Sequence, residues 1–141
     1  MRKVRPYKGK YKIKNPKKYV GNKKNVIYRS LWERKFMLYC DKTDAILEWS
    51  SEELAIPYMS PVDNKMHRYY PDFYIKMIDI RGNIREKIIE IKPKFQTREP
   101  KNTHSSVYNR WLINDAKWRS AMKHCHAHKQ EFRVLTEDHL F

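Results

Sequence analysis

Glycine, cysteine and long apolar runs are scarce in this chain of 141 residues, and each shortage excludes a class of protein. Three glycines leave no room for a glycine-rich phosphate-binding loop. Two cysteines, Cys40 and Cys125, cannot form a disulfide framework, so we expect reduced thiols and an intracellular protein. No apolar run approaches the roughly 20 residues that span a bilayer, and the N-terminus is too polar for a signal peptide. We expect a soluble protein without membrane attachment.

Aromatic residues, by contrast, are numerous enough to build a hydrophobic core. The chain has 4 Trp, 10 Tyr and 5 Phe, and 40% of its residues are hydrophobic, which excludes wholesale disorder. Its length fits one domain and is too short for two.

Acidic residues are absent from the first 24 positions, where eleven of the 31 lysines and arginines lie. The whole chain has a formal charge of +15, and residues 25–141 contribute only +4 of it. An arm with this charge binds polyanions, because neutralised phosphates release their counterions. We therefore predict a basic N-terminal arm over residues 1–24 and a folded domain over 25–141, with a purely solubilising arm as the alternative. The arm residues expected to contact DNA are Lys10, Lys12, Lys14, Lys17, Lys18, Lys23 and Lys24.

Hydrophobic periodicity predicts two amphipathic helices, over residues 30–41 and 106–126. Ser30 and Glu33 have the spacing of a capping box at the start of the first helix. The order of elements predicts an α+β fold in which helices pack against a mixed sheet. The expected strands are 46–50, 54–58, 68–80, 84–92 and 132–136, with a turn at 81–83 and a loop over 93–105.

Two acidic residues and a lysine are predicted to share one face of the hairpin in the middle of the chain. Glu90 and Lys92 are two apart on a strand and project from the same face. A three-residue turn at 81–83 places Asp72 opposite Lys92 and diagonal to Glu90, on that face. A two-residue turn would move Asp72 to the other face.

Carboxylates that lie this close repel each other unless a cation sits between them, and oxygen ligands suit Mg²⁺ or Mn²⁺. A neighbouring lysine can orient a water or stabilise charge on a phosphate. An acid two positions before a lysine occurs five times in the chain, but only Glu90 lies on a strand paired with that of Asp72. The alternative is an exposed cross-strand ion pair that contributes about 0.2–1 kcal/mol.

Pro71-Asp72 followed by Glu90-Ile91-Lys92 resembles the PD-(D/E)XK nuclease motif, and the element order resembles the restriction-endonuclease-like αβββαβ core of that superfamily. The sequence also resembles the head-completion nucleases of T4-like phages, which are similar to the N-terminal nuclease of TnsA-type transposition proteins. The matching stretches cover nearly the whole chain: residues 14–21, 28–33, 49–53, 56–58, 70–73, 89–93, 96–97, 114–118 and 135–137.

The resemblance implies a Mg²⁺-dependent DNA nuclease, with Mn²⁺ able to substitute, that acts in phage head completion and head–tail joining. It assigns Asp72 and Glu90 as metal ligands, together with the backbone carbonyl of Ile91. Lys92 is the implied catalytic lysine, and Glu33 completes the site through a water on the metal.

Two further residues match the family more loosely. The resemblance assigns Gln96 and Lys117 to positioning or to contact with DNA phosphates. For Glu33 a second role stays open, because the capping box at Ser30 also accounts for a glutamate at this position.

The expected partners are double-stranded DNA and, through the arm, a phage capsid, portal or neck protein. The implied location is the host cytoplasm during assembly, and the virion is left open. The alternative function is a non-catalytic, DNA-binding structural protein of the virion head or neck that retains the nuclease fold.

Overall fold

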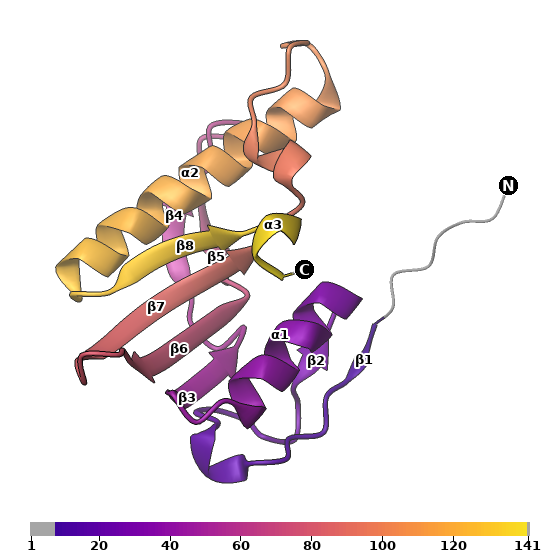
Figure 1. Cartoon of the computed structure of the whole chain (residues 1–141). Helices are drawn as coiled ribbons and strands as arrows, with labels where there is room; N and C mark the ends of the chain where they lie inside the picture. Colours follow the sequence, from indigo (N-terminus) through magenta and orange to yellow (C-terminus); the bar gives the residue numbers. More distant parts are fainter. Residues whose placement is uncertain (1–7, 141) are drawn as a thin grey trace, which may run out of the picture.

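A four-stranded mixed sheet forms the centre of the structure, a computed structural model that describes residues 8–140 (Figure 1). Its strand order is β3-β6-β7-β8. Strands β3 (Ile46–Ser51), β6 (Phe73–Ile78) and β7 (Ile84–Ile91) are antiparallel neighbours, whereas β8 (Glu131–Leu135) pairs in parallel with β7. A parallel pair needs a long crossover connection, which here contains the helix α2 (Ser106–Ala127).

Helix α1 (Leu31–Lys42) and helix α2 cover opposite faces of the sheet (Figure 1). Successive side chains of a strand point to opposite faces. Phe73 and Ile89 pack in one core cluster with Phe36 of α1, whereas the neighbouring Ile88 lines a cavity next to α2. The order α1, β3, β6, β7, α2, β8 confirms the expected αβββαβ core.

A second, smaller sheet is inserted between β3 and β6. Its antiparallel strands β4 (Ile56–Met59) and β5 (Met66–Tyr69) pack against α2 through Tyr58, Tyr69 and Ala121. No helix in the described part of the chain is long and apolar enough to cross a membrane. The remaining elements are short: β1 (Gly9–Lys10), which pairs with β2 (Ile27–Tyr28), η1 (Pro16–Lys18), η2 (Lys94–Thr97) and α3 (Glu137–Leu140).

The predicted strand over 68–80 is wrong in its extent. The chain leaves β5 at Tyr69, bends through residues 70–72 and begins β6 at Phe73, so one predicted strand is in fact two. Strand β5 pairs with β4, and only β6 forms the hairpin with β7. Pro71 accounts for the break, because a proline has no N–H to donate to a sheet.

The hairpin turn is longer than the predicted three residues. Ile78 is the last residue of β6 to pair, with Ile84 of β7, and residues 79–83 form the loop. Asp79 organises this loop, because its Oδ1 accepts hydrogen bonds from the backbone N–H groups of Arg81 and Asn83, both at 2.9 Å. An aspartate that binds backbone two residues ahead is typical of a tight turn.

The longer loop shifts the register of the hairpin by two residues from the prediction. Phe73 lies opposite Ile89, and the same register carried one residue further sets Asp72 opposite Glu90 instead of Lys92. Because side chains alternate with a period of two, this shift leaves Asp72 on its predicted face. The predicted partner of Asp72 is thus wrong, while the predicted face is right.

Two tyrosines pack the basic segment over residues 8–24 onto the domain. Tyr11 and Tyr19 are buried, and their rings meet the indole of Trp49 edge-on, with centroids 5.9 and 4.8 Å apart. Contacts of this geometry add to the free energy gained from burial. The rest of the predicted arm, residues 1–7, lies outside the described residues.

Asp41, in the last turn of α1, has no exposed surface and fixes the same segment by hydrogen bonds. Its carboxylate accepts from the Tyr11 hydroxyl and the Lys14 backbone N–H, both at 2.8 Å, and from the Asn15 N–H at 3.0 Å. A buried carboxylate is tolerated when hydrogen bonds satisfy it in this way.

Lys18 caps the carboxyl end of α1. Its ammonium donates to the carbonyl oxygens of Cys40 at 2.6 Å, Asp41 at 3.3 Å and Thr43 at 2.8 Å. The last carbonyls of a helix have no partner within the helix, and a cation near them is also favoured by the helix dipole. Lys18, which was expected to contact DNA, is therefore engaged inside the domain.

Replacing this cap tests its role. We expect Lys18→Met to lower the free energy of unfolding by about 1–3 kcal/mol, because helix carbonyls lose a charged donor. The exposed neighbour Lys17 provides the control, and Lys17→Met should change stability by less than about 0.5 kcal/mol. Chemical denaturation measures both, and equal effects of the two substitutions would contradict the capping role.

Candidate active site

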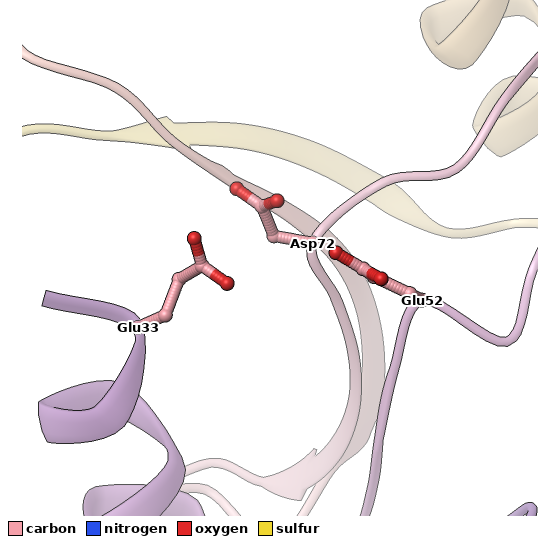
Figure 2. Close-up of side chains that lie close together, drawn as sticks. All are labelled: Glu33, Glu52 and Asp72. Atoms are coloured by element: carbon pink, nitrogen blue, oxygen red, sulfur yellow. The ribbon is translucent and has the colours of Figure 1, made fainter. Parts of the chain in front are cut away.

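Three carboxylates from distant parts of the chain meet at one end of the central sheet (Figure 2). Glu33 lies in the first turn of α1, Glu52 directly follows β3, and Asp72 directly precedes β6. One carboxylate oxygen from each residue lies within 4.8 Å of the others. We call Glu33, Glu52 and Asp72 the carboxylate cluster.

Glu33 is held in place by the start of α1. The Ser30 hydroxyl accepts a hydrogen bond from the Glu33 backbone N–H at 3.2 Å, which confirms the expected N-cap. The Glu33 carboxylate turns back and accepts from the Arg29 backbone N–H at 3.3 Å. Glu33 thus stabilises the start of the helix and also belongs to the carboxylate cluster, so its role in the cap does not exclude a role in the site.

Backbone contacts between neighbouring strands bring Glu52 and Asp72 together. The Glu52 N–H donates to the Asp72 carbonyl at 3.2 Å. Glu52 has a φ of +53°, in the left-handed region that residues other than glycine seldom adopt. Figure 2 shows its side chain pointing from the end of β3 toward Asp72.

The backbone of β7 contributes to the same place. The N–H of Ile91 donates to Oδ2 of Asp72 at 2.7 Å. The N–H and C=O of one strand residue face the same neighbour, so the Ile91 carbonyl also points toward Asp72. This is the direction that the predicted role of that carbonyl as a ligand requires.

Glu90 is a fourth carboxylate, and a tyrosine fixes it. It is only 5% exposed, and its Oε2 accepts a hydrogen bond from the hydroxyl of Tyr69, which ends β5. Burial and the charge of Glu90 raise the pKa of Tyr69, so this hydroxyl stays protonated and remains a donor.

Two lysines act electrostatically on the pair Asp72 and Glu90. The charge of Lys92 opposes the rise in the pKa of Asp72. The ammonium of Lys117, from α2, lies 5.7 Å from the centroid of the Tyr69 ring. Burial lowers the pKa of Lys117, and the charge of Glu90 opposes that shift. Both predicted lysines therefore lie within electrostatic range of the predicted carboxylates.

Burial and the charges of neighbouring acids raise the pKa values of Glu33 and Asp72. Burial, followed by the charge of Asp72, raises the pKa of Glu33 to about 7. Burial, followed by the charge of Glu90 and hydrogen bonding between the two carboxyl groups, raises the pKa of Asp72 well above its usual range. A divalent cation would relieve this repulsion, and a donor set made of carboxylates and a carbonyl suits Mg²⁺ or Mn²⁺. The residues present therefore fit such an ion.

The other residues predicted to contact DNA lie in different surroundings. Gln96 lies in η2, shortly after β7. The lysines of the basic segment divide into three sets. Lys10, Lys12, Lys23 and Lys24 are exposed around a cavity of about 410 Å³, Lys14 and Lys17 are exposed elsewhere on the segment, and Lys18 is the internal cap of α1.

Sequence reasoning gave no role to Glu52, Tyr69 or Arg29. Glu52 and Arg29 both lie within stretches that resemble the nuclease family, but glutamate and arginine are too common for their type alone to mark a site. Tyr69 lies close to the Pro-Asp motif, but its contact with the site depends on the break between β5 and β6, which the sequence analysis did not predict.

The raised pKa of Glu33 predicts how stability depends on pH. The folded state favours the protonated acid, so in EDTA the free energy of unfolding should fall as pH rises from about 4.5 to about 7 and then level off. Glu33→Gln keeps the helix cap and should be more stable than the parent at pH 8, by on the order of 2 kcal/mol. Denaturation at several pH values measures this, with the exposed Glu99→Gln as control. A parent and a Glu33→Gln variant with parallel pH profiles would contradict the prediction.

Comparisons with known proteins identify the family of this chain. A family model described as "TnsA-like endonuclease N terminal" matches residues 43–137, which contain β3 to β8 and the acids Glu52, Asp72 and Glu90. The "Head completion nuclease" of Enterobacteria phage T4 is 37% identical to this chain over 145 aligned positions, which cover 95% of this chain and 93% of that protein. The chain belongs to the TnsA-like endonuclease N-terminal family.

Proposed function

We propose that this protein is a metal-dependent deoxyribonuclease of the PD-(D/E)XK class that acts in phage head completion. The observation that supports the proposal is the grouping of Glu33, Glu52 and Asp72 at one end of the sheet, where Glu90 and Lys92 also act on Asp72. The three grouped acids come from separate parts of the chain, and a purely structural role would not require acids to be held where they repel each other. Membership of an endonuclease family supports the same conclusion.

Each residue of the site has a role in hydrolysis of a phosphodiester. Asp72, Glu90 and the Ile91 carbonyl hold the metal, and the Tyr69 hydroxyl keeps Glu90 in one orientation. A bound Mg²⁺ or Mn²⁺ supplies charge that polarises the phosphate and makes water a stronger acid. The Lys92 ammonium stabilises the negative charge that develops on the phosphate.

Glu33 suits the transfer of a proton near neutral pH. Without a cation, burial and the charge of Asp72 raise its pKa to about 7, and a bound cation would lower that pKa and favour the ionised carboxylate. The ionised carboxylate can accept a proton from the attacking water. Attack in line with the leaving oxygen then gives a 5′-phosphate and a 3′-hydroxyl, as in similar nucleases.

The context of phage assembly rests on the relative from phage T4, whose name describes head completion. With 37% identity over nearly the full length of both chains, we infer the same process for this protein. Its partners would then be double-stranded DNA and a capsid, portal or neck protein, and it would act in the host cytoplasm, where heads are assembled.

Removal of single site groups tests the catalytic assignment. We expect Asp72→Asn and Lys92→Ala to lower nicking of supercoiled plasmid by about 100-fold or more, because each removes a group that acts in the transition state. Both variants should still bind DNA. EDTA should abolish nicking by the parent, and Mg²⁺ or Mn²⁺ should restore it.

The matched control is Asp115→Asn, which removes a carboxylate from α2 that pairs with Arg119. Its nicking rate should equal that of the parent. Equal cleavage by the parent and Asp72→Asn would overturn the assignment of residues. If no divalent ion supports nicking, the protein is instead a non-catalytic DNA-binding protein of the virion.

The lysines around the 410 Å³ cavity are proposed to bind DNA phosphates. Replacing Lys12 and Lys24 together by Gln should reduce the slope of log affinity against log salt by about 0.9 for each phosphate that the protein no longer neutralises. Replacing Lys123 and Lys129, exposed near the carboxyl end of α2, removes the same charge elsewhere and should leave the slope nearly unchanged. Fluorescence anisotropy of a DNA duplex in EDTA measures the slope. Equal slopes for both double variants would point to a protein partner for these lysines.

A further inference from the structure

Arg29 touches two members of the carboxylate cluster through different atoms. It lies between β2 and the N-cap of α1, and its backbone N–H donates to Glu33. Its guanidinium binds Glu52 with two hydrogen bonds, from Nε to Oε1 at 2.8 Å and from the Nη2 nitrogen to Oε2 at 3.1 Å. The guanidinium therefore lies next to the position where the cluster would hold a cation.

This ion pair contributes little to stability by itself, because half of the Arg29 side chain is exposed to water. The Arg29 guanidinium and the Glu52 carboxylate could nevertheless each bind a different partner. Two parallel N–H donors match the oxygens of a phosphate as well as those of a carboxylate. The Glu52 carboxylate, in turn, lies within 4.8 Å of the oxygens of Glu33 and Asp72 and can serve as a ligand to the same cation.

The two uses of Glu52 oppose each other. A divalent cation in the cluster would repel the guanidinium. It would also neutralise part of the charge of the Glu52 carboxylate and so weaken the ion pair with Arg29. Arg29 would then be a free cation at the edge of the metal site, beside the phosphate that the proposed reaction places there. The charges of Glu33 and Asp72, which also act on Arg29, would be neutralised in the same event.

We propose that Glu52 is a further metal ligand that binds Arg29 while the site holds no cation, and that metal binding frees Arg29 to bind a DNA phosphate. The inference rests on the proposed function, since it concerns the same metal and the same substrate. It adds a coupling: metal raises DNA affinity through Arg29, and DNA raises metal affinity by the same factor. Each ligand thus favours binding of the other, whichever of the two binds first.

Two variants separate the partners of this pair. All proteins carry Lys92→Ala, so that DNA stays intact, and a DNA duplex is titrated by fluorescence anisotropy in EDTA and in Mn²⁺. In the parent, which carries Lys92→Ala alone, Mn²⁺ should raise DNA affinity by at least about fivefold. Arg29→Gln should abolish most of this increase while leaving affinity in EDTA unchanged.

Glu52→Gln should have the opposite signature. With Arg29 already free, DNA affinity in EDTA should increase, and this increase should disappear in the double variant with Arg29→Gln. Mn²⁺ binding without DNA, measured by isothermal titration calorimetry, should weaken in Glu52→Gln and tighten in Arg29→Gln. If the two residues only formed a surface ion pair, Glu52→Gln and Arg29→Gln would not change the Mn²⁺ affinity in opposite directions.

Arg119→Gln is the matched control, because Arg119 is an exposed arginine that pairs with Asp115 through the same Nε atom at 2.9 Å. It should change DNA affinity equally in EDTA and Mn²⁺ and leave Mn²⁺ binding unchanged. The inference is overturned if Arg29→Gln weakens DNA binding equally in both conditions, or in neither. Failure of both the parent and the wild type to bind Mn²⁺ would overturn the proposed function itself.

Discussion

Repulsion between carboxylates at one end of the sheet is the constraint on which the site depends. The positions of these acids are set by the backbone: Asp72 by the start of β6, Glu52 by the end of the adjacent β3, and Glu33 by the capped start of α1. None of the three positions follows from attraction between the side chains. The packing of α1 and the sheet must therefore offset the repulsion, and a cation that enters the cluster stabilises the folded protein by removing it.

Asp41 shows what the fold does with a carboxylate that has only a structural role. It is fully buried, and one hydroxyl and two backbone N–H groups donate to it. Glu33 in the cluster lacks such a complement of donors: it accepts one backbone hydrogen bond, and burial together with the charge of Asp72 raises its pKa. This contrast within one chain supports a role for the cluster in binding something that comes from outside the domain.

Much of the fold could be predicted from the sequence because its signals are local. Hydrophobic periodicity identified α1 and α2, and the spacing of Ser30 and Glu33 identified the first turn of α1. The face of Asp72 was also predictable, because a register error of two residues does not change it. The error itself arose from Asp79, whose side chain organises a longer loop than the predicted three-residue turn at 81–83.

The rest of the site could not be predicted, because it depends on contacts between segments. Glu52 reaches the cluster only through the pairing of β3 with β6 and a left-handed turn of its own backbone, and no pattern in the sequence signals such a turn at a glutamate. Tyr69 reaches Glu90 because β5 leaves the main sheet to pair with β4. The local periodicity of the sequence predicts neither of these contacts.

The basic segment illustrates the same limit and bears on how DNA would be recognised. Its charge alone suggests an appendage, whereas Tyr11 and Tyr19 are part of the core around Trp49, and Lys18 caps α1. Removal of the whole segment would therefore disturb the domain as well as the charge. Because the segment is fixed to α1 and β3, the elements that carry Glu33 and Glu52, its exposed lysines keep one position relative to the carboxylate cluster. The lysines proposed to bind DNA phosphates and the acids proposed to hold a metal are thus connected through one hydrophobic core, so a bound duplex would contact both in a fixed geometry.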